Sequence, residues 1–439
     1  MRFLASFVVA CVFAAQGLAQ YNVPSISAEV PDRHAVAIRW WGQGMVSIET
    51  YWNLKVVIDP ISKKSGSALP DVEADLVLLS HEHTDQNNVD GVKREPHLVR
   101  GIDESGKHCH INHRFDRVEN SLECQWWEDT KANVDKRTSH TIGVYAIPAW
   151  RNNAEGSARV SAAMFKITVD GVTILYCGSL GQAELTDEQL KKIHKVDVLL
   201  VSTAAAEDQL HSPATRISQQ VKPRFIVPID YEPKESIGDV MGIDAMWRVE
   251  ERDHNTLAVC QSQQPVFGSK LVFLSPEPYQ PTGELAELLT KMDAACKASQ
   301  KVFAPLSANQ LNWQPPNGTH TPRWNVEHML GRQLGFFSQI YATIDPDTFA
   351  HVDLNPAQMP PDYKAAHPNW DGAEDARQME RANAYVRRFA YLLEGVDLDA
   401  KAPGSFWTPR KLLEQMDRHF AEHTANVERK FELEGWPKE

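Results

Sequence analysis

The feature of this 439-residue sequence that most restricts its fold is a change of pattern near Ser275. Before that residue, short apolar runs are separated by turn residues, a pattern that predicts many buried strands. After it, apolar residues recur at three- and four-residue spacing, which predicts amphipathic helices. Pro276, Pro278 and Pro281 lie between the two patterns and predict a stiff linker. We therefore expect two domains of different class, with boundaries at residues 20–275 and 283–439 and a linker over 276–282.

The predicted elements follow these patterns along the whole chain. The four helices expected after the linker lie within about 155 residues and predict a bundle. In the first domain we expect one capped helix, at 186–193, among the strands. The strands expected there span 34–41, 45–50, 54–59, 76–80, 162–169, 172–177, 196–201, 225–229 and 271–274, and the helices of the bundle span 283–304, 324–344, 373–394 and 409–432.

The first nineteen residues are typical of a secretory signal peptide. Arg2 precedes an almost wholly apolar run, and small residues at Gly17 and Ala19 suit cleavage before Gln20. The run is shorter than the ~20 residues that a membrane-spanning helix needs, and no later segment is long and apolar enough. We expect an exported protein without a stable membrane span.

The net charge argues against a nucleic-acid-binding protein, and the cysteine content argues against a disulfide-stabilised one. The net charge of −13, from 45 basic and 58 acidic residues, makes nucleic acid an unsuitable partner. Cys11 lies in the signal peptide, so the mature chain keeps an odd, scattered set of cysteines, which is not a disulfide framework. The spacing permits a Cys109–Cys124 bridge without requiring one.

Two histidines and an aspartate follow the strand expected at 76–80, in the order His81-Glu82-His83-Thr84-Asp85. Histidines one residue apart at the end of a strand can face one cation, and the aspartate can reach a second. The motif resembles His-x-His-x-Asp-His of the metallo-β-lactamase-fold hydrolases, and the resemblance extends over about 34–275. It implies a four-layer αββα sandwich, closest to the lactonase-like branch, with one or two metals at the strand ends.

Four positions depart from the pattern of that family. Gln86 replaces the histidine of the motif that binds the second metal, and Arg151 replaces the third histidine that binds the first metal. Ser179 replaces the aspartate that bridges the two metals, and Asp230 replaces the last histidine of the family. A permanent cation at Arg151 offers no lone pair to a metal. We predict a degenerate site in which the Arg151 guanidinium pairs with Asp85 and Asp230 and zinc binds poorly.

Two alternatives stay open for this site. His81, His83 and Asp85 are three ligands, enough for one catalytic zinc with water completing the coordination. The other alternative is that the two histidines are ordinary buried residues of a retained fold. A second group, His108, His110 and His113 with Cys109, is expected to be a solvated loop.

The final predicted helix carries His419 and His423, which are four residues apart and therefore lie on one face. A third histidine, His328, belongs to the second helix of the bundle. The C-terminal part resembles the DinB-like four-helix bundles over about 283–439, and in that family one histidine of the second helix and two of the fourth hold a metal. The resemblance implies a metal site formed by these three histidines.

The apolar arc of the second helix does not include His328, which lies beside Trp324, Gly331 and Gly335. We therefore expect His328 to face a cleft between helices. The alternative is that all three histidines are ordinary capping or core residues. Three neutral imidazoles would leave a divalent metal with an open position. We favour zinc, and nickel, manganese and iron remain open.

Three functions are compatible with these patterns. The first is an exported metal-dependent hydrolase or transferase that acts on a small molecule, with its working metal on the bundle and the sandwich as scaffold or binding cleft. The second is a hydrolase that uses a residual mononuclear site at His81, His83 and Asp85. The third is a non-catalytic binding protein. The sequence identifies no catalytic residue, substrate or oligomeric state.

Overall fold

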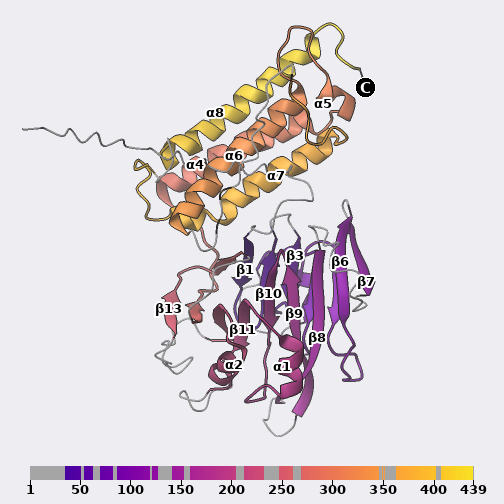
Figure 1. Cartoon of the computed structure of the whole chain (residues 1–439), viewed down its shortest axis with the longest axis vertical. Helices are drawn as coiled ribbons and strands as arrows, with labels where there is room; N and C mark the ends of the chain where they lie inside the picture. Colours follow the sequence, from indigo (N-terminus) through magenta and orange to yellow (C-terminus); the bar gives the residue numbers. More distant parts are fainter. Residues whose placement is uncertain are drawn as a thin grey trace, which may run out of the picture.

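The computed structural model describes residues 35–50, 54–62, 70–82, 87–118, 121–126, 141–152, 159–203, 212–231, 247–260, 268–345, 349, 351, 362–401 and 407–438. Within them, a β-sandwich is followed by a helical bundle (Figure 1), so the predicted fold class is confirmed. No helix in this part of the chain is long and apolar enough to cross a bilayer. The predicted signal peptide lies outside the described residues.

The sandwich consists of two sheets that enclose a common core. The smaller has six strands in the order β14-β1-β2-β3-β4-β5, and the larger has nine in the order β13-β15-β12-β11-β10-β9-β8-β6-β7. Their bounds are β1 Val36–Trp40, β2 Val46–Glu49, β3 Lys55–Ile58, β4 Leu76–Leu79, β5 His97–Arg100, β6 Asn112–Val118, β7 Ser121–Trp126, β8 Thr141–Asn152, β9 Arg159–Val169, β10 Val172–Tyr176, β11 Val198–Ser202, β12 Phe225–Ile229, β13 Arg248–Glu251, β14 Thr256–Val259 and β15 Lys270–Phe273.

Local sequence accounts for the way these strands are joined. All four residues of β4 are buried, as a continuous apolar run predicts. Asp170 and Gly171 both have positive φ, 47° and 73°, and connect β9 to β10 with Val169 opposite Val172. Both central residues of a tight type I′ hairpin need positive φ, and Asp-Gly supplies it at low cost. The hairpin predicted at this dipeptide is therefore present.

Among the described residues, two helices cover the outer face of the larger sheet (Figure 1). They are α1, Asp187–Ile193, and α2, Pro213–Val221. Thr186 and Gln189 form a reciprocal capping box at the start of α1. Val196, Leu199 and Ile217 belong to the apolar cluster between these helices and the sheet.

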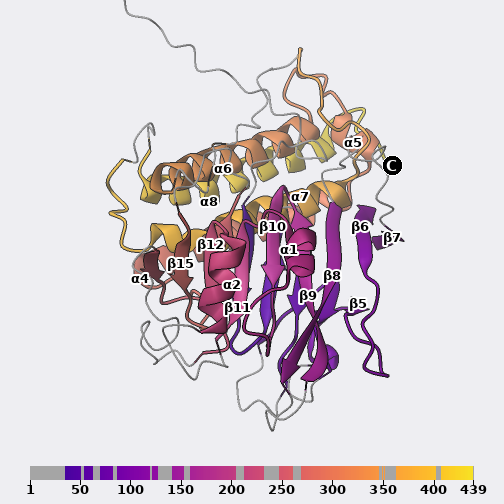
Figure 2. The ribbon, with the colours of Figure 1, turned by 60° about the horizontal axis from the view of Figure 1, so that its bottom comes forward.

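In the part of the bundle that the structure describes, there are four long helices and one short one. These are α4 Gly283–Phe303, α5 Ala308–Asn312, α6 Pro322–Ile344, α7 Gly372–Arg388 and α8 Pro409–Glu428. The predictions extended the last two helices too far, because each ends in a separate 3₁₀ turn, Ala390–Leu393 after α7 and Arg429–Glu432 after α8. Figure 2 shows α6 and α8 running side by side, with α7 nearer the sandwich.

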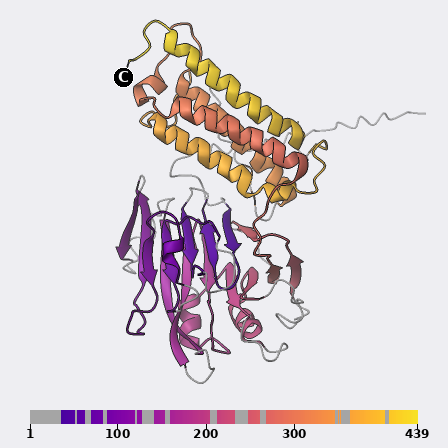
Figure 3. The same ribbon diagram turned by 180° about the vertical axis from the view of Figure 1, so that it is seen from behind.

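The two domains share one contiguous apolar cluster, which includes Val36 of the sandwich and Leu285 of the bundle. At its edge, Arg388 at the end of α7 donates to the Thr50 carbonyl at 3.0 Å and to Glu49 Oε1 at 2.6 Å. Figure 3 shows α7 lying above the strand ends.

The bundle contacts the end of the sandwich that is remote from the His81 motif. Glu49 is opposite Lys55 at the beginning of β3. β3 and β4 are parallel and run away from that point, and they end just before Asp59 and Ser80. The two histidine sites predicted from sequence are therefore on opposite sides of the domain junction.

Candidate metal centre

Two packed helices, α6 and α8, carry the three histidines of the bundle. Thr321 caps α6 by accepting a hydrogen bond from the Trp324 backbone nitrogen at 3.0 Å, and Thr408 caps α8. Proline occupies the first turn of both helices, where its missing N–H costs nothing. The caps fix where each helix begins and so place His328 six residues into α6.

The structure brings His328, His419 and His423 together. One ligand atom from each lies within 4.8 Å of those of the other two, so small side-chain rotations would bring all three to one ion. Among the described residues, no other group of three or more His, Cys, Asp or Glu side chains has this arrangement. The ring centroids of His328 are 5.0 Å from His419 and 4.9 Å from His423.

The side chain of Trp324, one turn earlier on α6, packs against His328. The Trp324 ring stacks on the His328 imidazole at 4.5 Å with an interplanar angle of 12°. His320 lies on the same indole at 3.7 Å. His328 is only partly buried, in keeping with the predicted position between helices.

Asn325 fixes the orientation of His423, a contact that the sequence analysis did not identify. Asn325 Nδ2 donates to the Thr321 carbonyl at 2.8 Å, so its Oδ1 faces His423 Nδ1 at 2.7 Å. Because Oδ1 can only accept, the proton of the neutral imidazole is on Nδ1 and the Nε2 lone pair is available. Asn325 precedes His328 by three residues and therefore lies on the same helix face. This spacing could have indicated from the sequence that Asn325 lies beside the histidine cluster.

The charge state of the cluster also suits a cation. Burial lowers the pKa of His419 to about 3, and the imidazoles of His423 and His328 act in the same direction. Burial followed by His328 lowers the pKa of His423 to about 4. Both rings are therefore neutral at pH 7. His419 Nδ1 is buried and has no hydrogen-bond partner among the described residues, an arrangement that costs roughly 1–3 kcal/mol and that a bound cation would offset.

The other candidate site, in the sandwich, is only partly within the described residues. His83, Asp85 and Gln86 lie outside them, so the predicted residual metal site is not tested. His81 is 3% exposed and its Nδ1 is 2.7 Å from Ser80 Oγ and 3.7 Å from Asp59 Oδ2. Burial raises the pKa of Asp59 to about 6 although Ser80 and Tyr176 donate hydrogen bonds to it.

The predicted Arg151–Asp230 ion pair is not present. Asp230 accepts hydrogen bonds from Ser179 Oγ at 3.0 Å and Ser202 Oγ at 2.9 Å. Arg151 donates instead to the Glu82 carbonyl at 3.2 Å. Both hydroxyls donate to the same oxygen, Oδ2, of this partly buried carboxyl group. The other half of the prediction, Arg151 with Asp85, lies outside the described residues.

One smaller prediction was wrong, and one possibility that the sequence left open is not realised. The segment around His108 is not all loop, because His113 lies in β6, where it is paired with β8. Cys109 is a free thiol, so the Cys109–Cys124 bridge that spacing permits is not formed.

Comparison with known proteins agrees with this division of the chain. Residues 37–230 match a β-lactamase superfamily domain, and residues 291–426 match the DinB superfamily. A UPF0173 metal-dependent hydrolase of Thermococcus kodakarensis is 23% identical over 205 residues, which cover 45% of this chain and 84% of the relative.

Two solved structures are also similar to this chain. A candidate Zn-dependent hydrolase of the metallo-β-lactamase superfamily from Thermotoga maritima is 17% identical, with 54% of this chain and 98% of the other covered, at a TM-score of 0.34. A candidate metal-dependent hydrolase from Parabacteroides distasonis is 17% identical, with coverages of 47% and 87%, at a TM-score of 0.32.

The family matches and the fold together define a two-domain protein of mixed class. Its N-terminal part is a metallo-β-lactamase-like domain. Its C-terminal part is a DinB-superfamily domain.

Proposed function

We propose that this protein is an exported metal-dependent hydrolase or transferase whose working metal is held by the bundle. The observation that carries the proposal is the convergence of His328, His419 and His423, with the proton of His423 held on Nδ1 by Asn325. A relative of this chain is named as a metal-dependent hydrolase, which supports a divalent metal as cofactor.

The donor set fits a divalent metal of the zinc type. Three imidazole nitrogens from two helices would hold it and leave a coordination position open. When bound, such a metal supplies a Lewis acid or a water acidified to a pKa of about 7. The residues of this chain orient the site: Asn325 holds the proton at His423 Nδ1, and Trp324 restricts rotation of the His328 ring.

A second candidate function places the metal in the sandwich, at His81, His83 and Asp85. The observation in its favour is the buried contact of His81 with Ser80 beside Asp59, because a hydrogen-bonded imidazole is held in one orientation. Against it, an arginine and an aspartate hydrogen-bonded to two serines occupy positions where the family has ligands.

The experiment that separates the two is metal analysis of the full-length protein and two double variants. We expect His419→Ala with His423→Ala to lose the stoichiometric metal, and His81→Ala with His83→Ala to keep it. His97→Ala, at an exposed histidine, is the matched control. Turnover of chromogenic ester and amide substrates by the same proteins tests catalysis. The reverse pattern of metal loss would transfer the function to the sandwich. Turnover unchanged in both double variants would favour the non-catalytic binding protein.

A further inference from the structure

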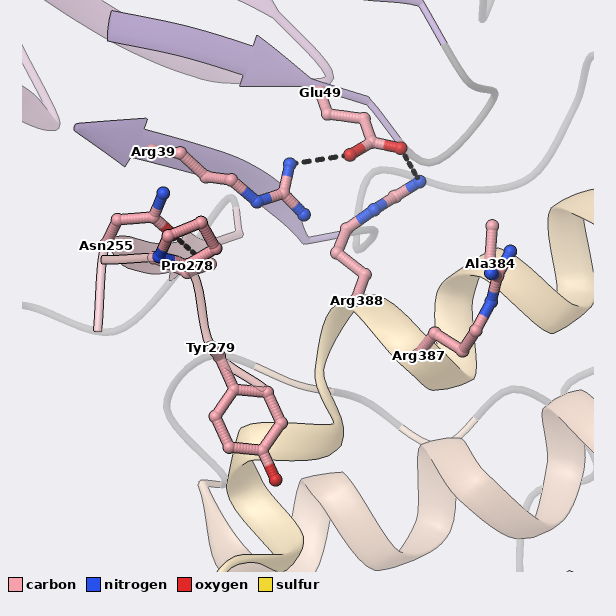
Figure 4. A pocket seen from close by; sticks show the side chains of 9 residues that line it. Arg39, Glu49, Asn255, Pro278, Tyr279, Ala384, Arg387 and Arg388 are labelled. Carbon is pink, nitrogen blue, oxygen red and sulfur yellow. Dashed lines mark hydrogen bonds and ion pairs between the residues drawn. The ribbon is translucent and has the colours of Figure 1, made fainter. Parts of the chain in front are cut away.

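A cavity of about 240 Å³ lies at the junction of the two domains (Figure 4). Arg39 and Glu49 line it from the sandwich, Pro278 and Tyr279 from the linker, and Arg388 from the end of α7. The cavity is distinct from both histidine sites, because it adjoins the beginning of β3 and not the strand ends that carry Asp59 and His81.

Two guanidinium groups in this cavity share one carboxylate. Arg39 Nη1 is 2.7 Å from Glu49 Oε2, and Arg388 Nη2 is 2.6 Å from Glu49 Oε1. Both carboxylate oxygens are thus engaged, and one positive charge remains uncompensated. The third arginine of the lining, Arg387, is neutralised by Glu380 and Asp293 on the bundle.

Two hydrogen-bond donors around this charge are not used. Arg388 Nε and Asn255 Nδ2 are buried and have no partner among the described residues. Asn255 is 0% exposed, and its Oδ1 already accepts a hydrogen bond from Thr256. Buried donors without acceptors are costly, and they are concentrated where the charge is positive. Figure 4 shows Arg39 and Asn255 on one side of the space and Arg388 on the other.

We propose that this cavity is a binding site for a small oxyanion, a carboxylate or a phosphate, that joins the sandwich to the bundle. Guanidinium groups bind both kinds of anion through paired N–H donors. The volume is below that of pockets for drug-sized ligands, about 300 Å³ or more, and so suits an anion of few heavy atoms. Its occupant would contact β1 and α7 at once and thereby stabilise the domain junction.

The test is calorimetric titration of the chelator-treated full-length protein with inorganic phosphate and, separately, with succinate, at constant ionic strength in chloride. We expect saturable binding of at least one anion. The anion that binds shows whether the cavity takes a phosphate or a carboxylate. Arg39→Gln should weaken binding about tenfold. Arg94→Gln, at an arginine that pairs with Glu73 and Asp75 on the sandwich surface, is the matched control and should bind as the unsubstituted protein does.

Two further variants keep the proposal open to refutation. Asn255→Asp replaces the amide with a negatively charged side chain of the same size. It should abolish anion binding while circular dichroism shows an intact fold. His423→Ala should bind the anion unchanged, which excludes the metal centre as its location. Absence of saturable binding by either anion, equal affinity in Arg39→Gln, or loss of affinity in His423→Ala would overturn the proposal.

Discussion

The two histidine sites of this protein differ in what surrounds the imidazoles. In the bundle, three rings lie together and Asn325, a neutral acceptor, orients one of them. In the sandwich, His81 Nδ1 is 3.7 Å from the buried Asp59 carboxyl group. Asp230 accepts hydrogen bonds from two serines, and Arg151 donates to the Glu82 carbonyl. The two sites thus offer a cation different surroundings: imidazole nitrogens and a neutral amide in the bundle, and a carboxyl group beside an imidazole in the sandwich.

The largest loss of metal affinity is expected from removing His328, the one histidine of the three that comes from α6. His328→Ala should lower zinc affinity at least about 100-fold, because structural zinc sites gain roughly 10–16 kcal/mol from all their ligands together. Competition with a chromogenic chelator measures the affinity, with His97→Ala as control. Unchanged zinc affinity would mean that the histidines of α8 hold the metal without His328. The three converging imidazoles would then not be what distinguishes the bundle from the sandwich.

The next test attempts to restore the site in the sandwich. The combination Gln86→His, Arg151→His, Ser179→Asp and Asp230→His returns the ligand types of the related family. We expect the variant to bind about one additional metal ion per chain, because an imidazole then replaces the Arg151 cation and a carboxylate replaces the Ser179 hydroxyl. Arg151→His alone should bind little, since Asp230 would still be engaged by Ser202. If the combined variant folds and gains no metal, ligand identity does not explain the difference between the sites.

Asn325 offers a smaller change that sharpens the same comparison. Asn325→Ala should lower metal affinity by about 10–100-fold, the usual effect of losing a group that orients a histidine ligand. Asn325→Asp keeps an acceptor at the His423 nitrogen and should restore most of that affinity. A purely structural role would instead lower the melting temperature of both variants and leave the affinity of the folded protein unchanged.

The smallest effect concerns the partly buried carboxyl group of Asp230 in the sandwich. Burial raises the pKa of Asp230 above its usual value of 3.8, so the ionised carboxylate destabilises the fold at neutral pH. Asp230→Asn should raise the free energy of unfolding at pH 7 by about 1 kcal/mol or less, because the amide oxygen still accepts from the serines. The advantage should vanish as the pH falls below 3.8, where aspartate is protonated in both states. Urea unfolding at several pH values measures it, and an advantage that grows on acidification would contradict this account.

The sequence predicted elements best where apolar periodicity was strong. β4, the β9–β10 hairpin and the helices α4, α6 and α8 lie close to their expected positions. β6 was missed because its sequence, NHRFDRV, is mostly polar, and its pairing with β8 supplies what local propensity does not. The end of α7 was misplaced because Leu392 and Leu393 continue the apolar pattern although the backbone leaves the helix at Phe389.

For the sites, helical spacing sufficed to place His419 and His423 on one face, and family resemblance added His328. Sequence could not show that Ser179 and Ser202 donate to Asp230, since these residues come from separate strand ends. Nor could it show the junction of Arg388 with Glu49, because long-range pairs leave no local pattern.

The pairing of Arg388 with Glu49 also has a consequence for biosynthesis. The two residues are 339 positions apart, so at roughly 5–20 residues per second a ribosome needs on the order of 20–70 s between them. During that interval Arg39, ten residues before Glu49, is already available as a partner for the carboxylate. The nascent sandwich can therefore fold with Glu49 paired, and the late arrival of the α7 terminus completes the junction.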